Sequence, residues 1–188
     1  VTMAHTMYGS ANPIGGENVV IKLKWGEMPE QLLEKRATRT LKMALGENPR
    51  APGTAYPNTR MGVIAAIDTA FARALDYRKK WKRYKEKMAA APKGSLPDML
   101  PPKKDLRMDA LLDVLDGKIV VRCHSYRADE TLQLMRLSRK YGFKIAAFEH
   151  LQQAYRIADE LKAMDIGVAM FPDFWNYKIE ASDFTPYG

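Results

Sequence analysis

The chain has 188 residues, and 46% of them are hydrophobic, which is enough apolar material for the core of one domain or of a piece of a larger one. This composition excludes a disordered chain. No apolar run approaches the roughly 20 residues of a membrane helix, and the first residues lack the basic start and apolar block of a signal peptide. The single cysteine, Cys123, excludes an internal disulfide. We expect a soluble protein of the cytoplasm or the periplasm.

The net charge of +8 is concentrated in one short segment. Residues 78–87 hold seven lysine or arginine residues and one glutamate. Such a cluster on a predicted helix is typical of a solvated helix face. We therefore expect neither nucleic-acid nor membrane binding. Nucleic-acid contact through this helix and a protein-partner surface are the alternatives.

The first part of the chain predicts short elements. Residues 1–8 and 19–24 are rich in β-branched and aromatic side chains and predict strands, with a glycine-punctuated loop at 9–16 between them. A proline at the start predicts a helix over 28–36. The apolar run 41–45 ends at a glycine and is followed by a proline-rich loop.

A long helix is predicted from the N-cap residue Thr59 to about residue 90. Its apolar side chains recur at helical spacing, which indicates a core or helix-partner face. They are Val63, Ile67, Ala70, Phe71, Ala74, Tyr77, Trp81, Tyr84 and Met88. Four prolines between residues 92 and 102 then predict an extended connector. We expect residues 59–104 to form a helical insertion between strands.

From residue 105 onward a helix followed by a short apolar strand occurs three times. The helices are predicted at 105–115, 128–141 and 154–164, and the strands at 118–124, 143–150 and 166–172. This alternation is typical of parallel strands buried under helices, either in an α/β barrel or in an open, doubly wound sheet of the flavodoxin kind.

Two of the three histidines, His124 and His150, end successive predicted strands. In parallel α/β folds the carboxyl ends of the strands form the active-site face. Adjacent strands would hold these imidazoles a few ångström apart, and neutral imidazole is a favoured zinc ligand. The pattern predicts a shared metal site.

The segments that carry these histidines resemble the amidohydrolase superfamily. The similar residues are Val121-Arg122-Cys123-His124-Ser125-Tyr126-Arg127-Ala128-Asp129-Glu130, Ala147-Phe148-Glu149-His150 and Ala154-Tyr155, with weaker similarity at 9–16 and 41–50. The nearest groups are imidazolonepropionase-like and prolidase-like members. The resemblance implies a (β/α)8 TIM-type barrel in which the two histidines, ending strands five and six, bind the catalytic metal.

By the same resemblance, Lys42 is the candidate ligand from strand four. In prolidase-like relatives a lysine there is carboxylated and bridges two metals. This modification requires a neutral amine, so burial or nearby cations must lower the lysine pKa. Glu47 is the alternative ligand, since a carboxylate needs no modification to bind metal.

Two features of the superfamily are missing from the chain. His5 has no partner for the His-x-His pair of strand one. The catalytic aspartate of strand eight would lie beyond Gly188, and Asp173 follows the wrong strand. We expect residues 1–188 to be a partial barrel domain of roughly strands three to seven, inactive alone.

For the intact protein, the resemblance implies a metal-dependent hydrolase of an amide or other C–N bond in a cyclic amide or peptide-like substrate. The cofactor would be one or two divalent ions, with zinc favoured. Tyr126 and Arg127, after strand five, are the candidate substrate-binding residues, since arginine suits a carboxylate. The protein could form homo-oligomers. The alternative is a non-catalytic barrel that serves as a binding or scaffold protein.

Overall fold

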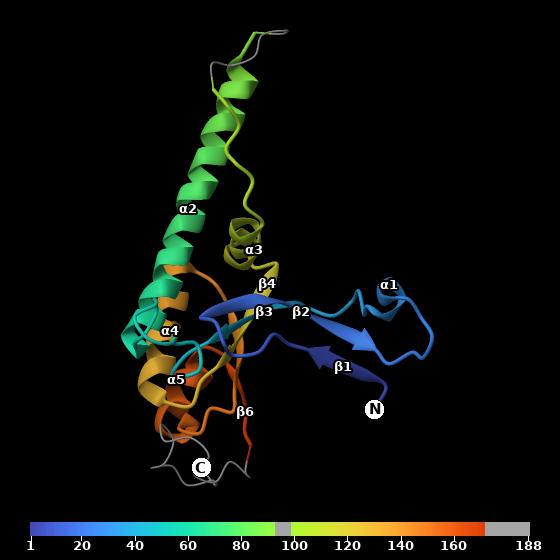
Figure 1. Ribbon diagram of the computed structural model, residues 1–188, viewed down its shortest axis with the longest axis vertical. Helices are drawn as coiled ribbons and strands as arrows, with labels where there is room; N and C mark the ends of the chain where they lie inside the picture. Colours follow the sequence, from blue (N-terminus) through green and yellow to red (C-terminus); the bar gives the residue numbers. More distant parts are fainter. Residues whose placement is uncertain (93–98, 172–188) are drawn as a thin grey trace.

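The computed structural model describes residues 1–92 and 99–171. The fold is α/β, and its strands form one mixed sheet of antiparallel and parallel pairs in the order β1-β2-β3-β4-β5-β6 (Figure 1). The strands are β1 Met3–Thr6, β2 Ile14–Lys22, β3 Arg39–Ala44, β4 Ile119–His124, β5 Ile145–Glu149 and β6 Gly167–Ala169. The helices are α1 Pro29–Leu32, α2 Arg60–Ala90, α3 Leu106–Leu115, α4 Ala128–Tyr141 and α5 Ala158–Ala163, which follows the 3-10 helix η1 Ala154–Ile157.

Strands β3 to β6 are parallel and neighbour each other in chain order. A doubly wound sheet of the flavodoxin kind has a point where the strand order reverses. The described strands have no such point, which favours a barrel over this alternative. A curled, six-stranded half-barrel is consistent with part of a TIM-type barrel, while the numbering of its strands as three to seven stays a prediction.

Strands β1 and β2 are antiparallel to their neighbours. The prediction that 9–16 is wholly loop is wrong, because β2 begins at Ile14, which pairs with Met43 of β3. The predicted helix at 28–36 is shortened to α1, since Leu33 adopts an extended backbone and bridges to Ile21.

The core lies between the parallel strands and the helices. Alternate strand residues such as Leu41, Met43, Val121 and Cys123 enter it, together with residues from α2, α3 and α4. Their neighbours in the strands, including Lys42, point to the opposite face. One face of the sheet is therefore apolar and covered by helices, and the other carries polar side chains. None of the described helices has the length and apolar character needed to cross a membrane.

Helix α2 begins as predicted, with the Thr59 side chain accepting a hydrogen bond from the Gly62 amide at 3.0 Å. Its first half is buried as far as Tyr77, which confirms the core interpretation there. Beyond Tyr77 the helix rises away from the sheet (Figure 1), Trp81 and Tyr84 are half-buried and Met88 is exposed. Residues 78–90 are called the projecting segment below. Whether 59–104 is an insertion stays a prediction.

Candidate metal site and the face around it

The rings of His124 and His150 meet at the carboxyl ends of β4 and β5. Nδ1 of His124 lies 3.0 Å from Nε2 of His150, within hydrogen-bond distance, and the ring centroids are 4.4 Å apart. His124 is the last residue of its strand, whereas His150 is the first residue after β5. The structure thus brings together the two histidines that the sequence singles out.

The backbone of His150 adopts a left-handed conformation, with φ of 44°. Residues other than glycine and asparagine rarely adopt it, because Cβ crowds the backbone. Such strain persists where the surrounding structure imposes it, and it often marks functional sites. Here it turns the chain at the strand end where the His150 ring meets His124.

Tyr126 packs against both imidazoles. Its ring stacks on His150 at a centroid distance of 4.8 Å and an interplanar angle of 28°, and meets the edge of His124 at 4.8 Å. The residue is only 3% exposed. The prediction that Tyr126 binds substrate stays untested, and its observed contacts form a wall beside the paired imidazoles.

The polar face of the sheet continues below the histidines as a row of charges. Lys42 of β3 lies in register with Arg122 of β4, and Nε of Arg122 is 2.6 Å from Oε1 of Glu149. His5 of β1 lies near this row, with its Nε2 3.0 Å from the Thr40 hydroxyl. A buried carboxylate and a partly buried guanidinium therefore pair beneath the imidazoles.

The surroundings of His150 and Lys42 favour the neutral forms of both side chains more than water does. Burial, with a smaller contribution from the Lys42 charge, lowers the pKa of His150 to about 4. Burial also lowers the pKa of Lys42, although Glu149 opposes the shift. A neutral imidazole is the form that binds metal, and a neutral amine is the form that can be carboxylated.

The two imidazoles fit a zinc-like ion. Nitrogen ligands at about 2.0–2.1 Å from a tetrahedral ion lie about 3.3 Å from each other. From the observed 3.0 Å, Nδ1 of His124 and Nε2 of His150 would have to part by a few tenths of an ångström and turn from each other toward the ion, with loss of the proton between them. Within residues 1–92 and 99–171, no group of three or more His, Cys, Asp or Glu side chains could hold an ion. Lys42 is outside that set of residue types, so its role stays a prediction.

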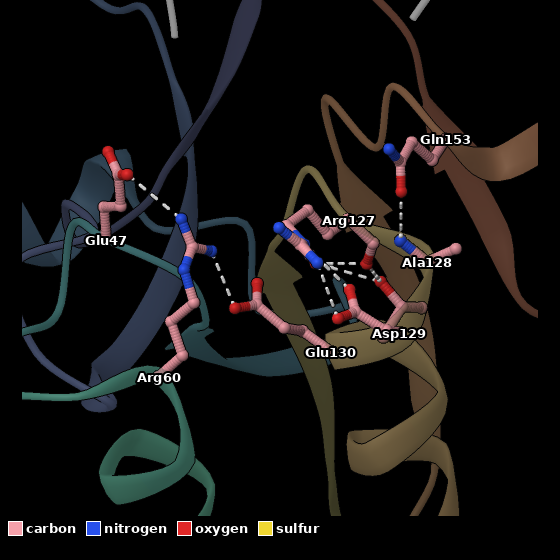
Figure 2. A network of polar contacts seen from close by, with 9 residues as sticks. Glu47, Arg60, Arg127, Ala128, Asp129, Glu130 and Gln153 are labelled. Carbon is pink, nitrogen blue, oxygen red and sulfur yellow. Dashed lines mark hydrogen bonds and ion pairs between the residues drawn. The ribbon is translucent and has the colours of Figure 1, made fainter. Parts of the chain in front are cut away.

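The other predicted site residues are engaged in ion pairs (Figure 2). Glu47, the alternative ligand, pairs with Arg60 at 3.0 Å, and Arg60 also binds Glu130 at 2.7 Å. The guanidinium of Arg127 makes two 2.9 Å bonds to the Asp129 carboxylate. A substrate carboxylate would have to compete with Asp129 for Arg127. Asp173 lies outside the described residues.

Several residues of the site were not predicted from the sequence. Arg122 precedes His124 by two positions, so strand alternation would have placed it on the histidine face. Glu149 directly precedes His150. Gln153 bonds to the loop after β4, and no pattern in the sequence points to it.

Comparisons with known proteins point to amidohydrolases. No family model matches the chain. It is 32% identical to "Amidohydrolase tasK" of Hapsidospora irregularis over 202 residues, covering 99% of this chain and 20% of that protein. The crystal structure of an amidohydrolase from Thermotoga maritima MSB8 superposes with a TM-score of 0.83 at 33% identity, over 98% of this chain and 46% of that one.

The chain thus spans less than half the length of either relative. Neither comparison distinguishes imidazolonepropionase-like from prolidase-like members. Over nearly its whole length, the chain is similar to amidohydrolases, and the comparisons support that superfamily in general.

Proposed function

We propose that the protein is a metal-dependent hydrolase of an amide or other C–N bond in a cyclic amide or peptide-like substrate. One observation carries the proposal: two imidazoles from adjacent parallel strands lie 3.0 Å apart at the carboxyl ends of those strands. The similarity to proteins named amidohydrolases supports the reaction type.

In this proposal His124 and His150 hold a divalent ion, with zinc favoured by the nitrogen ligands. A bound ion supplies a Lewis acid and lowers the pKa of water toward neutrality. The low pKa of His150 keeps its imidazole neutral at physiological pH, so no proton competes with the metal there. Tyr126 covers one side of the pair and excludes bulk water from it.

Lys42 is proposed as the bridge to a second ion. Its Nζ carries one of the charges that lower the His150 pKa, so it lies within electrostatic range of the imidazoles. Burial favours its neutral amine, as carboxylation requires. The side chain of Arg127 is 40% exposed, and it would bind a substrate carboxylate in place of the Asp129 carboxylate.

The test is metal content in the full-length protein. His124→Ala and His150→Ala are each expected to abolish zinc binding, measured by mass spectrometry of the dialysed protein. His5→Ala is the matched control, because this third histidine bonds to Thr40 and is expected to leave zinc bound. Unchanged zinc in both site variants would contradict the proposal and favour the non-catalytic barrel.

A further inference from the structure

Helix α4 begins without a capping side chain of its own. Its N-cap residue is Arg127, which has an extended backbone and whose side chain accepts no hydrogen bond from the N–H groups of the first turn. The first N–H groups of a helix have no partner within the helix and need an acceptor from elsewhere. Arginine offers only donors, so the acceptor for Ala128 has to come from another segment.

Gln153 supplies that acceptor from the loop after β5. Its Oε1 accepts a 3.0 Å hydrogen bond from the Ala128 amide (Figure 2), and its backbone N–H donates a 3.2 Å bond to the Tyr126 carbonyl. Gln153 is 6% exposed, so water cannot readily replace either bond. One residue therefore fastens both the loop after β4 and the first residue of α4.

The two fastened loops are the ones that follow the paired imidazoles. His124 ends the strand before the first loop, and His150 begins the second. Tyr126, whose carbonyl Gln153 binds, packs its ring against both histidines. A shift of one loop against the other would change the separation of the two imidazoles.

We infer that Gln153 is a positioning residue that holds the His124 and His150 rings side by side, within a few tenths of an ångström of the separation that a shared metal ion requires. It acts through its bonds to the Ala128 amide and the Tyr126 carbonyl. The relevance to metal rests on the proposed function, whereas the control of ring separation does not.

The experiment compares three variants of the full-length protein. Gln153→Met keeps the length of the side chain and removes the acceptor. Gln153→Glu keeps an acceptor and places a negative charge at a helix N-terminus, where the dipole favours it. Gln152→Met is the matched control, because this adjacent glutamine is fully buried and its amide has no hydrogen bond within the described residues.

The first readout needs no metal. In metal-free protein labelled with ¹⁵N-histidine, the coupling across the His124–His150 hydrogen bond is measured by NMR. We expect Gln153→Met to abolish it, while Gln153→Glu and Gln152→Met keep it. A coupling that survives in Gln153→Met, or disappears equally in Gln152→Met, overturns the inference.

The second readout is the dissociation constant for zinc. Gln153→Met is expected to raise it about tenfold, as loss of an orienting contact around a metal site typically does. Gln153→Glu and Gln152→Met are expected to stay within about twofold of the parent. Parent protein that shows the imidazole coupling but binds no zinc would refute the proposed function and leave the positioning role of Gln153 standing.

Discussion

At the scale of single residues, His150 is a candidate metal ligand whose backbone adopts an unfavourable conformation. Its φ of 44° requires a conformation that crowds Cβ in every residue except glycine. The ring it presents to His124 is therefore held at a cost to stability. That cost can be measured by removing the imidazole in two different ways.

We predict that His150→Gly is more stable than His150→Ala by about 1 kcal/mol, because both lose the ring and only glycine relaxes the left-handed backbone. Denaturant unfolding of the metal-free protein measures the difference. At His124, in an extended strand, the order should reverse, with glycine less stable than alanine. Equal stabilities of the two His150 variants would mean that the left-handed turn is absent in solution.

The sequence was enough to pair His124 with His150, because both end predicted strands and parallel strands end at one edge of a sheet. It could not predict that Gln153 caps another segment, since that contact depends on how two loops lie in space. Nor could it show that Arg127 already pairs with Asp129, two positions along the chain.

At the scale of elements, α2 has a packed half and a projecting half. Phe71 is fully buried, with its ring stacked on Phe143 at 4.6 Å and on Tyr141 at 5.3 Å. Trp81 belongs to the same apolar stripe but lies in the projecting segment, against the edges of Tyr77 and Tyr84. Helical spacing in the sequence treats all members of the stripe alike, and only the fold separates them.

We predict that Phe71→Ala lowers the free energy of unfolding by about 3–5 kcal/mol, because it leaves a cavity between α2 and α4. Trp81→Ala should cost much less, about 1 kcal/mol, since this side chain is only half-buried. Chemical denaturation of both variants gives the comparison. A larger loss from Trp81→Ala would show that the projecting segment is covered in the intact protein.

A second contact fastens α2 to α4 at the surface. The Asp68 carboxylate lies 2.6 Å from Lys140 Nζ and accepts a 2.7 Å bond from the Tyr141 hydroxyl. Both partners lower the pKa of Asp68 below its ordinary value of 3.8. The folded state therefore binds the proton less readily than the unfolded state does.

The stabilisation from Asp68 is thus present above pH of about 4 and lost as the pH falls through the lowered pKa. We predict that Asp68→Asn costs about 1 kcal/mol near neutral pH, a modest value because the pair is partly exposed. The difference from the parent should shrink as the pH drops toward 3, measured by unfolding at each pH. Asp76→Asn, whose exposed carboxylate lies 3.7 Å from Lys79, should show little change at any pH.

At the scale of the whole molecule, the sequence predicted parallel strands under helices, and sequential strand order then favoured a barrel over a doubly wound sheet. The antiparallel pairing of β1 and β2 was not predictable, because strand-forming residues carry no signal for direction. The course of the projecting segment likewise depends on where α3 rejoins α2.

The chain leaves the rest of the fold after Tyr77 of α2 and returns to it at Asp105, just before α3, and the two ends of this excursion meet at Tyr77. Its hydroxyl donates a 3.0 Å bond to Asp109 and accepts a 3.3 Å bond from the Asp105 amide. We predict that replacing residues 80–102 with about four glycine and serine residues leaves the melting temperature of the full-length protein within about 3 °C and the proposed zinc binding unchanged. A large loss of either would show that the deleted stretch supports the rest of the fold.

The proximity of Tyr77 and Asp105 also makes this excursion a suitable site for inserting another domain. A guest domain whose own termini lie close together, such as a fluorescent reporter, could be inserted here without moving α2 and α3 apart. Light emitted by such a guest would then report the abundance and location of the protein in living cells.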